Sequence, residues 1–101
     1  MGTISTKTGA GITEDVLRTI RENGYEMPKE VPGNGVCVIA QFAYTWAVMT
    51  DLSAMDYGRR YCFEHKDDAV ASLLSWEGTG HTPGPWIKCK GDGIDLLNPN
   101  L

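Results

Sequence analysis

The chain has 101 residues, of which 42% are hydrophobic and 22% charged, and its formal net charge is −4 at pH 7. This length argues for one domain, and the composition is that of a folded globular protein and not of a disordered one. The acidic balance argues against a general binder of nucleic-acid backbones, which needs a basic stripe. No uncharged apolar run reaches the roughly 18 residues of a membrane-spanning helix, and an odd number of cysteines suits a reducing cytoplasm. We therefore expect a cytoplasmic protein that does not associate with a membrane.

The first element that the sequence predicts is a helix over residues 13–23. The preceding residues 1–11 are small and polar, and we expect them to form a flexible lead-in to a single domain over 12–101. Thr13 is a good N-cap, two acidic residues follow it, and an apolar stripe runs along one side of the segment. Gly24 can adopt the left-handed conformation that ends a helix.

The middle of the chain favours strands. Residues 25–34 contain two prolines and are expected to form an extended connection that ends in a turn. Residues 36–52 lack glycine and proline and are rich in β-branched and aromatic side chains, which favours strands, although helical spacing also fits. The length of this segment predicts a hairpin that bends near 43–45; one long strand or a helix remain alternatives. Residues 59–64 are expected to form a third strand.

The last predicted element is a helix over residues 65–76. Asp67 and Asp68 fall in its first turn, where acidic side chains complement the helix dipole. Its predicted buried face consists of Ala69, Val70, Leu73, Leu74 and Trp76. Residues 79–101 show no periodicity and are expected to form a long irregular C-terminal tail that wraps over the domain. The predicted fold is α+β in the order α-β-β-β-α, a three-stranded antiparallel sheet with two helices packed on one face.

The second half of the chain carries a distinctive set of residues that matches a pattern known from other proteins. It consists of Arg60, Tyr61, Cys62, Phe63, then an Ala/Leu-rich helix, then Trp76, Glu77, Gly78, Gly84, Trp86, Ile87, Lys88, Gly91, Asn98 and Pro99. This pattern resembles a group of small uncharacterised phage and prophage proteins over residues 58–99, with Phe63 in place of tyrosine and Glu77 in place of aspartate. The resemblance implies a viral or prophage origin and the cytoplasm of a host cell. It implies no activity and no site residues.

Four side chains raise the hypothesis of a metal site: Cys62, His65, His81 and Cys89. The first two have a spacing found among zinc ligands, whereas the spacing of the last two matches no zinc motif. The alternative is that Cys62 is a buried core residue and that His65 begins the second helix. We expect no metal and no other cofactor.

Cys89 lies between Lys88 and Lys90, which would favour a thiolate if the side chain were exposed. A nucleophilic cysteine also needs an adjacent base, and His81 is the candidate. No third residue that would orient the base is evident in the sequence, and the local signatures of thiol enzymes are absent. We therefore expect no catalytic residues and a protein that is not an enzyme.

The function that the sequence favours is protein–protein binding by a non-enzymatic phage or prophage accessory protein. One form of this is inhibition of a host defence or regulatory complex, with a host or phage protein as the partner. The candidate partner-binding residues are Arg59, Arg60, Asp67, Asp68, Trp86, Lys88 and Lys90, although Trp86 is also expected to pack against the sheet. One alternative is a small nucleic-acid-binding module that uses Arg59, Arg60 and sheet aromatics such as Tyr61 and Phe63. A further alternative is a zinc-binding domain.

Overall fold

The structure is a computed structural model that describes residues 12–101, so the predicted lead-in over 1–11 lies outside the described residues. In the described part of the chain there are two helices and six strands. The helices are α2 (Glu14–Asn23) and α3 (Lys66–Ser75). The strands are β1 (Glu26–Val31), β2 (Gly35–Gln41), β3 (Trp46–Met49), β4 (Arg59–Phe63), β5 (Lys88–Gly91) and β6 (Ile94–Leu97).

The strands form one six-stranded antiparallel sheet in which each strand lies beside the next one in sequence. The predicted three-stranded sheet is therefore wrong, because β1 lies in the supposed connection and β5 and β6 lie in the supposed tail. β1 was hidden by Pro28, which is rare inside strands, and by its polar sequence Glu-Met-Pro-Lys-Glu-Val, in which only Val31 is buried. β5 and β6 have four residues each, too few for periodicity to reveal them.

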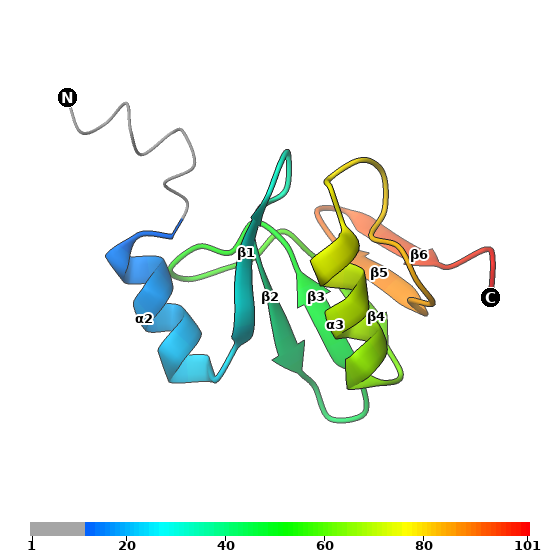
Figure 1. Ribbon diagram of the computed structural model, residues 1–101, viewed down its shortest axis with the longest axis horizontal. Helices are drawn as coiled ribbons and strands as arrows, with labels where there is room; N and C mark the ends of the chain where they lie inside the picture. Colours follow the sequence, from blue (N-terminus) through cyan, green and yellow to red (C-terminus); the bar gives the residue numbers. More distant parts are fainter. Residues whose placement is uncertain (1–11) are drawn as a thin grey trace.

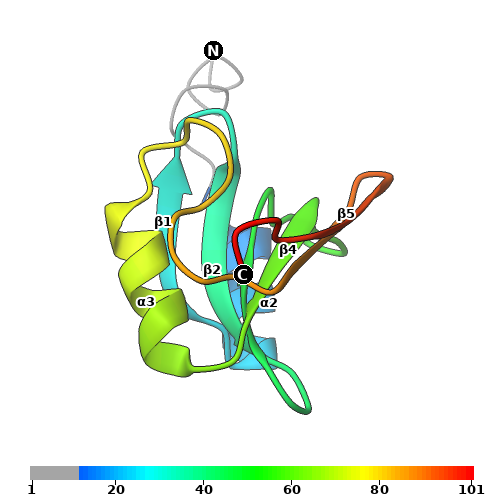
Figure 2. The ribbon, with the colours of Figure 1, turned by 90° about the vertical axis from the view of Figure 1, so that its right-hand side faces the viewer.

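The two helices lie on opposite faces of the sheet (Figures 1 and 2). Val36, Val38 and Ala40 of β2 pack into one cluster with α2, whereas the alternate residues Cys37 and Ile39 pack into a second cluster with α3. The prediction that both helices cover one face is wrong for this reason: β2 is apolar on both faces, so each face needs its own cover. Figure 2 also shows the β5–β6 hairpin projecting away from the side that α3 covers.

The first helix and the central hairpin are confirmed. The hydroxyl of Thr13 accepts a hydrogen bond from the backbone N–H of Val16 at 3.3 Å, and Gly24 has the left-handed φ of +69°. β2 and β3 pair through the register Gln41 to Trp46, so the hairpin bends over residues 42–45. Neither described helix is long and apolar enough to cross a membrane.

A side chain from β1 ends the second helix. The ammonium group of Lys29 donates to the carbonyl oxygens of Leu73, Leu74 and Trp76 at 2.8, 2.9 and 3.0 Å. The last carbonyls of a helix lack N–H partners in the next turn, although that of Leu73 also accepts from the N–H of Trp76 at 3.4 Å, and a cation complements the negative end of the helix dipole. Leu74 is 63% exposed, so its place in the predicted buried face of this helix is wrong.

The centre of the larger core is Tyr61, whose side chain is completely buried between α3 and the segment that follows it. The rings of Trp76 and Trp86 meet it edge to face, with ring centroids 5.8 and 5.3 Å away. Such pairs add to the stabilisation that comes from burial of the rings. Trp86 is only 4% exposed, which leaves little of its side chain for a partner, while its expected packing against the sheet is confirmed.

Candidate functional site

The basic residues among the candidate partner-binding residues are divided between the two faces of the sheet. Arg60 pairs with Lys90 in the register of β4 and β5, and Lys88 pairs with Cys62, so these side chains share the face on which α2 lies. Because α2 packs against β2 and β3, no helix of the described chain covers β4 to β6 on this side; we call this surface the open face.

Arg59 lies on the opposite face and joins an internal chain of hydrogen bonds. Its guanidinium donates to the side-chain oxygen of Asn34 and, at 3.1 Å, to the hydroxyl of Tyr61. Asp67 and Asp68 lie in the first turn of α3, the helix that covers this opposite face. Of the predicted partner-binding residues, the structure therefore brings together only Arg60, Lys88 and Lys90, the three on the open face.

The open face contains a pocket of about 320 Å³ lined by Phe42, Thr45, Arg60, Cys62, Ile87 and Lys88, which we call the Phe42–Arg60 pocket. The guanidinium of Arg60 lies over the ring of Phe42, 5.1 Å from its centroid, and donates to the hydroxyl of Tyr57 at 2.7 Å. Burial opposes the charge of Arg60, but hydrogen bonds with Tyr57 and Cys62 outweigh it and raise the pKa of the guanidinium. Arg60 is therefore a fixed, permanently charged wall of the pocket.

The two edges of the sheet differ in how they are protected. The edge strand β1 contains Pro28, which has no N–H to donate, and Met27 with a φ of +55° at the register shift. It also carries Glu26, Lys29 and Glu30. A proline, a bulge and charged side chains are the features by which proteins prevent an edge strand from pairing with another chain.

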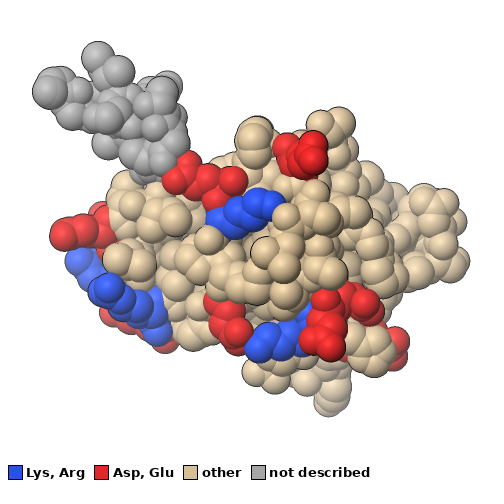
Figure 3. Space-filling model, in the orientation of Figure 1, with Lys and Arg blue, Asp and Glu red and all other residues tan. Residues whose placement is uncertain are grey.

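The other edge strand, β6, is less protected: it has no proline and no bulge, and its one charged side chain is Asp95. Its sequence is Ile-Asp-Leu-Leu, and Leu97 is 67% exposed. Figure 3 shows the side of the molecule that α3 covers, where the end formed by the C-terminal strands carries no charged side chain, whereas Lys90 and Asp95 lie on the opposite face, 3.9 Å apart. β6 is a short strand, apolar apart from Asp95, and no other strand of the described residues pairs with its outer edge.

The phase of the hydrogen bonds identifies the free backbone groups of β6. The pair that flanks a two-residue hairpin turn is hydrogen-bonded, and hydrogen-bonded pairs then alternate along an antiparallel ladder. Gly91 and Ile94 are the flanking pair, so every second pair from there is hydrogen-bonded. The bond from the N–H of Asn98 to the carbonyl of Ile87 at 3.0 Å agrees with this alternation. Asp95 and Leu97 therefore point their N–H and C=O groups away from β5.

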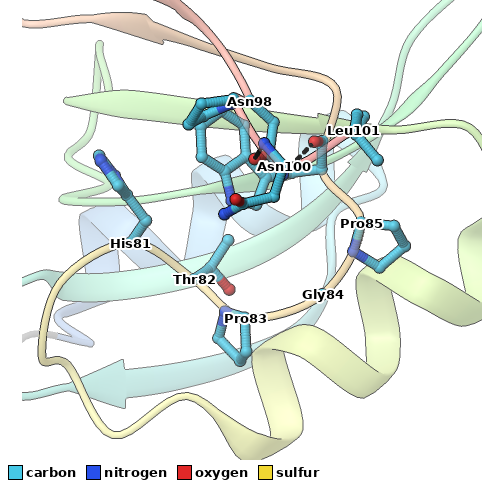
Figure 4. Close-up of a pocket in the computed structure, with 10 residues that line it drawn as sticks. His81, Thr82, Pro83, Gly84, Pro85, Asn98, Asn100 and Leu101 are labelled. Atoms are coloured by element: carbon cyan, nitrogen blue, oxygen red, sulfur yellow. Dashed lines mark hydrogen bonds between the residues drawn. The ribbon is translucent and has the colours of Figure 1, made fainter.

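A hollow of about 470 Å³ lies between residues 81–86 and 98–101 (Figure 4). Three of the polar side chains that line it have partners within the protein. Thr82 bonds to Ser72, the amide of Asn98 donates to the carbonyl of Trp86 at 2.8 Å, and His81 Nδ1 lies 2.9 Å from the hydroxyl of Tyr61. These bonds hold the segment after α3 and the C-terminal residues together, which is a structural role.

The residues of the metal hypothesis are dispersed. Cys62 faces the Phe42–Arg60 pocket, whereas Cys89 is buried in the core on the other side of the sheet. His81 is bonded to Tyr61, and His65 lies 3.6 Å from the carboxylate of Glu64. Within residues 12–101 no three His, Cys, Asp or Glu side chains come together as metal ligands.

Burial counts against the two hypotheses that relied on Cys89 as a nucleophile and on sheet aromatics as a stacking surface for bases. Burial raises the pKa of the Cys89 thiol, although a hydrogen bond from Tyr61 opposes the shift, so the thiol is protonated near neutral pH. Tyr61 and Phe63 are completely buried, so neither ring has a face free to stack on a base.

We expect the protein to lose stability as the pH rises above about 9. Burial raises the pKa of Cys37 from 9.0 to about 12 and that of Tyr61 from 10.0 to about 12. As the pH rises, the unfolded chain releases these protons before the folded chain does. For each group, the free energy of unfolding therefore falls between its pKa in the unfolded chain and its pKa in the folded chain. Urea unfolding at a series of pH values measures this fall, and a Tyr61→Phe variant should show a weaker decline above pH 10. A flat profile would contradict the assignment of buried neutral groups.

Comparison with protein-family models, curated proteins and solved structures finds no match.

The sequence indicated the basic residues of the open face but not Phe42, which lies in a hairpin loop with no local signal. The β6 edge was missed as well, although Asp92-Gly93 is a strong hairpin signal whose two residues have φ of +54° and +78°.

Proposed function

We propose that this chain is a non-enzymatic binding protein whose partner adds an extended segment to the free edge of β6. The observation that carries the proposal is the contrast between the two edges of one sheet: β1 has a proline, a bulge and three charges, whereas β6 is apolar apart from Asp95. Edge protection is the common state of soluble sheet proteins, so an unprotected edge marks a place where another chain pairs.

The interaction would use both the backbone and the side chains of β6. Asp95 and Leu97 supply outward N–H and C=O groups, which would form main-chain hydrogen bonds with an added strand. Ile94 and Leu96 point to one face of the sheet and Leu97 to the other. An added segment with apolar side chains would therefore cover leucines that are now exposed.

Two further considerations support a binding role over catalysis. The thiols of Cys37 and Cys89 have raised pKa values, and the side chains of His81, Thr82 and Asn98 in the hollow of Figure 4 are bonded within the protein. The predicted partner is a host or phage protein, as the resemblance of residues 58–99 to phage proteins implies, and inhibition of a host complex is one form that such binding would take.

An affinity capture from host lysate with edge variants tests the proposal. Asp95→Pro removes an outward N–H without removing a bond to β5, so the sheet is retained while an added strand loses a donor. We expect the wild type to capture a partner that Asp95→Pro fails to capture. The matched control is Asp95→Ala, which changes the same side chain but keeps the N–H and should capture the partner normally.

Leu97→Pro provides a second edge variant, because the N–H of Leu97 also points outward. Circular dichroism would show that each variant keeps its fold. Equal capture by the wild type and both proline variants would overturn the β6 edge as the binding element, and failure of the wild type to capture any partner would overturn the binding role. Concentration-dependent dimerisation that both prolines abolish would identify a second copy of the chain as the occupant.

A further inference from the structure

We propose that the Phe42–Arg60 pocket binds a carboxylate attached to a flat apolar group. This site lies on the open face and does not depend on the edge of β6, so it goes beyond the proposed function. It is formed by the β2–β3 loop, which supplies Phe42 and Thr45, by Arg60 and Cys62 of β4, and by Ile87 and Lys88 at the start of β5.

The charge of the pocket indicates an anionic ligand. Two of its lining side chains, Arg60 and Lys88, are cations, and the described chain contributes no carboxylate to the lining. Lys90 on the same face lies 3.9 Å from Asp95, but Lys88 takes part in none of the ion pairs within residues 12–101. The pocket thus has a local positive charge on a protein whose net charge is −4.

The geometry of Arg60 favours a carboxylate. A guanidinium has five N–H donors in a planar arrangement that matches the two oxygens of a carboxylate, and the bond to Tyr57 uses the NH1 end of the group. The ring of Phe42 under the guanidinium and the hydrogen bond to Tyr57 hold Arg60 in place before a ligand arrives. Such preorganisation lowers the entropy lost on binding.

The remaining walls favour an apolar group next to the carboxylate. Phe42 is half-buried and Ile87 is 36% exposed, so both offer apolar surface inside a pocket that otherwise carries charge. A volume of about 320 Å³ lies at the lower end of the range for small-molecule sites. The two sources of such a ligand are a free aromatic acid and an aromatic residue at the C-terminus of a protein.

A titration followed by NMR tests the site with N-acetylphenylalanine as the probe. We expect shifts at Phe42, Thr45 and Ile87, and binding about tenfold weaker or more for the corresponding primary amide, which has the same ring but no charge. 3-Phenylpropionate, which lacks the peptide group, separates the two sources: equal binding indicates a free acid, and tighter binding of N-acetylphenylalanine indicates a chain end.

Variants of the open face identify the groups that bind. Arg60→Gln and Lys88→Gln should each weaken binding of N-acetylphenylalanine, by about tenfold for the arginine. Lys90→Gln is the matched control, because Lys90 shares the face but does not line the pocket, and it should bind normally, as should Asp95→Pro. Absence of binding to the wild type, equal binding of acid and amide, or an equal loss in Lys90→Gln would overturn the proposal. Because the amide comparison uses the wild type, the test does not depend on the folding of any variant.

Discussion

Replacement of Trp86 by alanine is expected to destabilise the folded protein by about 3–5 kcal/mol. The indole is 4% exposed, packs in the larger core and meets the ring of Tyr61 edge to face at 5.3 Å. Its removal would leave a cavity beside the tyrosine, and the lost transfer energy and the cavity both lower the free energy of unfolding. Urea unfolding followed by circular dichroism measures the change without relying on tryptophan fluorescence.

The neighbouring residue provides the control for this prediction. Ile87 follows Trp86 directly but is 36% exposed, so Ile87→Ala should lower the free energy of unfolding by only about 1 kcal/mol. A Trp86→Ala protein that keeps wild-type stability but loses its partner would contradict the structure and restore Trp86 as a contact residue.

The second large effect is expected at Gly91, the last residue of β5. Its φ is +118°, and a Cβ built on it would lie 2.1 Å from the carbonyl oxygen of Gly58 in the neighbouring loop. Gly91→Ala therefore combines a strained backbone conformation with a backbone clash, and we expect a loss of about 3 kcal/mol or more in the free energy of unfolding. Thermal unfolding would show this as a large fall in Tm.

Gly93 in the same hairpin separates the two contributions. Its φ is +78°, but a Cβ there would meet no heavy atom within 4 Å. Gly93→Ala should therefore lose only the roughly 1–2 kcal/mol of a left-handed alanine. Equal effects of the two substitutions would show that the close approach of Gly91 to Gly58 has no part in holding β5 against β4.

The elements that could be located from the sequence are those whose ends or type are determined by residues within the element itself. The cap at Thr13 and the left-handed Gly24 define α2 without reference to the rest of the chain. The hairpin of β2 and β3 follows from a run of β-branched and aromatic residues. The sequence could not show which helix packs on which face of the sheet. An apolar run such as β2 is compatible with burial on one face or on both.

The candidate surfaces were less predictable because they depend on which face a residue occupies. Arg59 and Arg60 are adjacent in sequence, yet a strand directs them to opposite faces, so only Arg60 joins Lys88 and Lys90. Phe42 reaches Arg60 only through the pairing of β2, β3 and β4. The edge of β6 could have been inferred from Asp92-Gly93, since that dipeptide indicates a two-residue turn between two strands.

The order of the strands in the sheet has a consequence for how the chain reaches its fold. Since every strand pairs with the next one in sequence, most strand pairings close only a short loop. The exception is the pairing of β4 with β5, which closes a loop that contains α3. Short loops lose little entropy on closure, and sheets of this kind fold faster than sheets with distant pairings. The ladder can thus grow by one neighbour at a time, and the pairing of β4 with β5, which closes the longest loop, loses the most entropy.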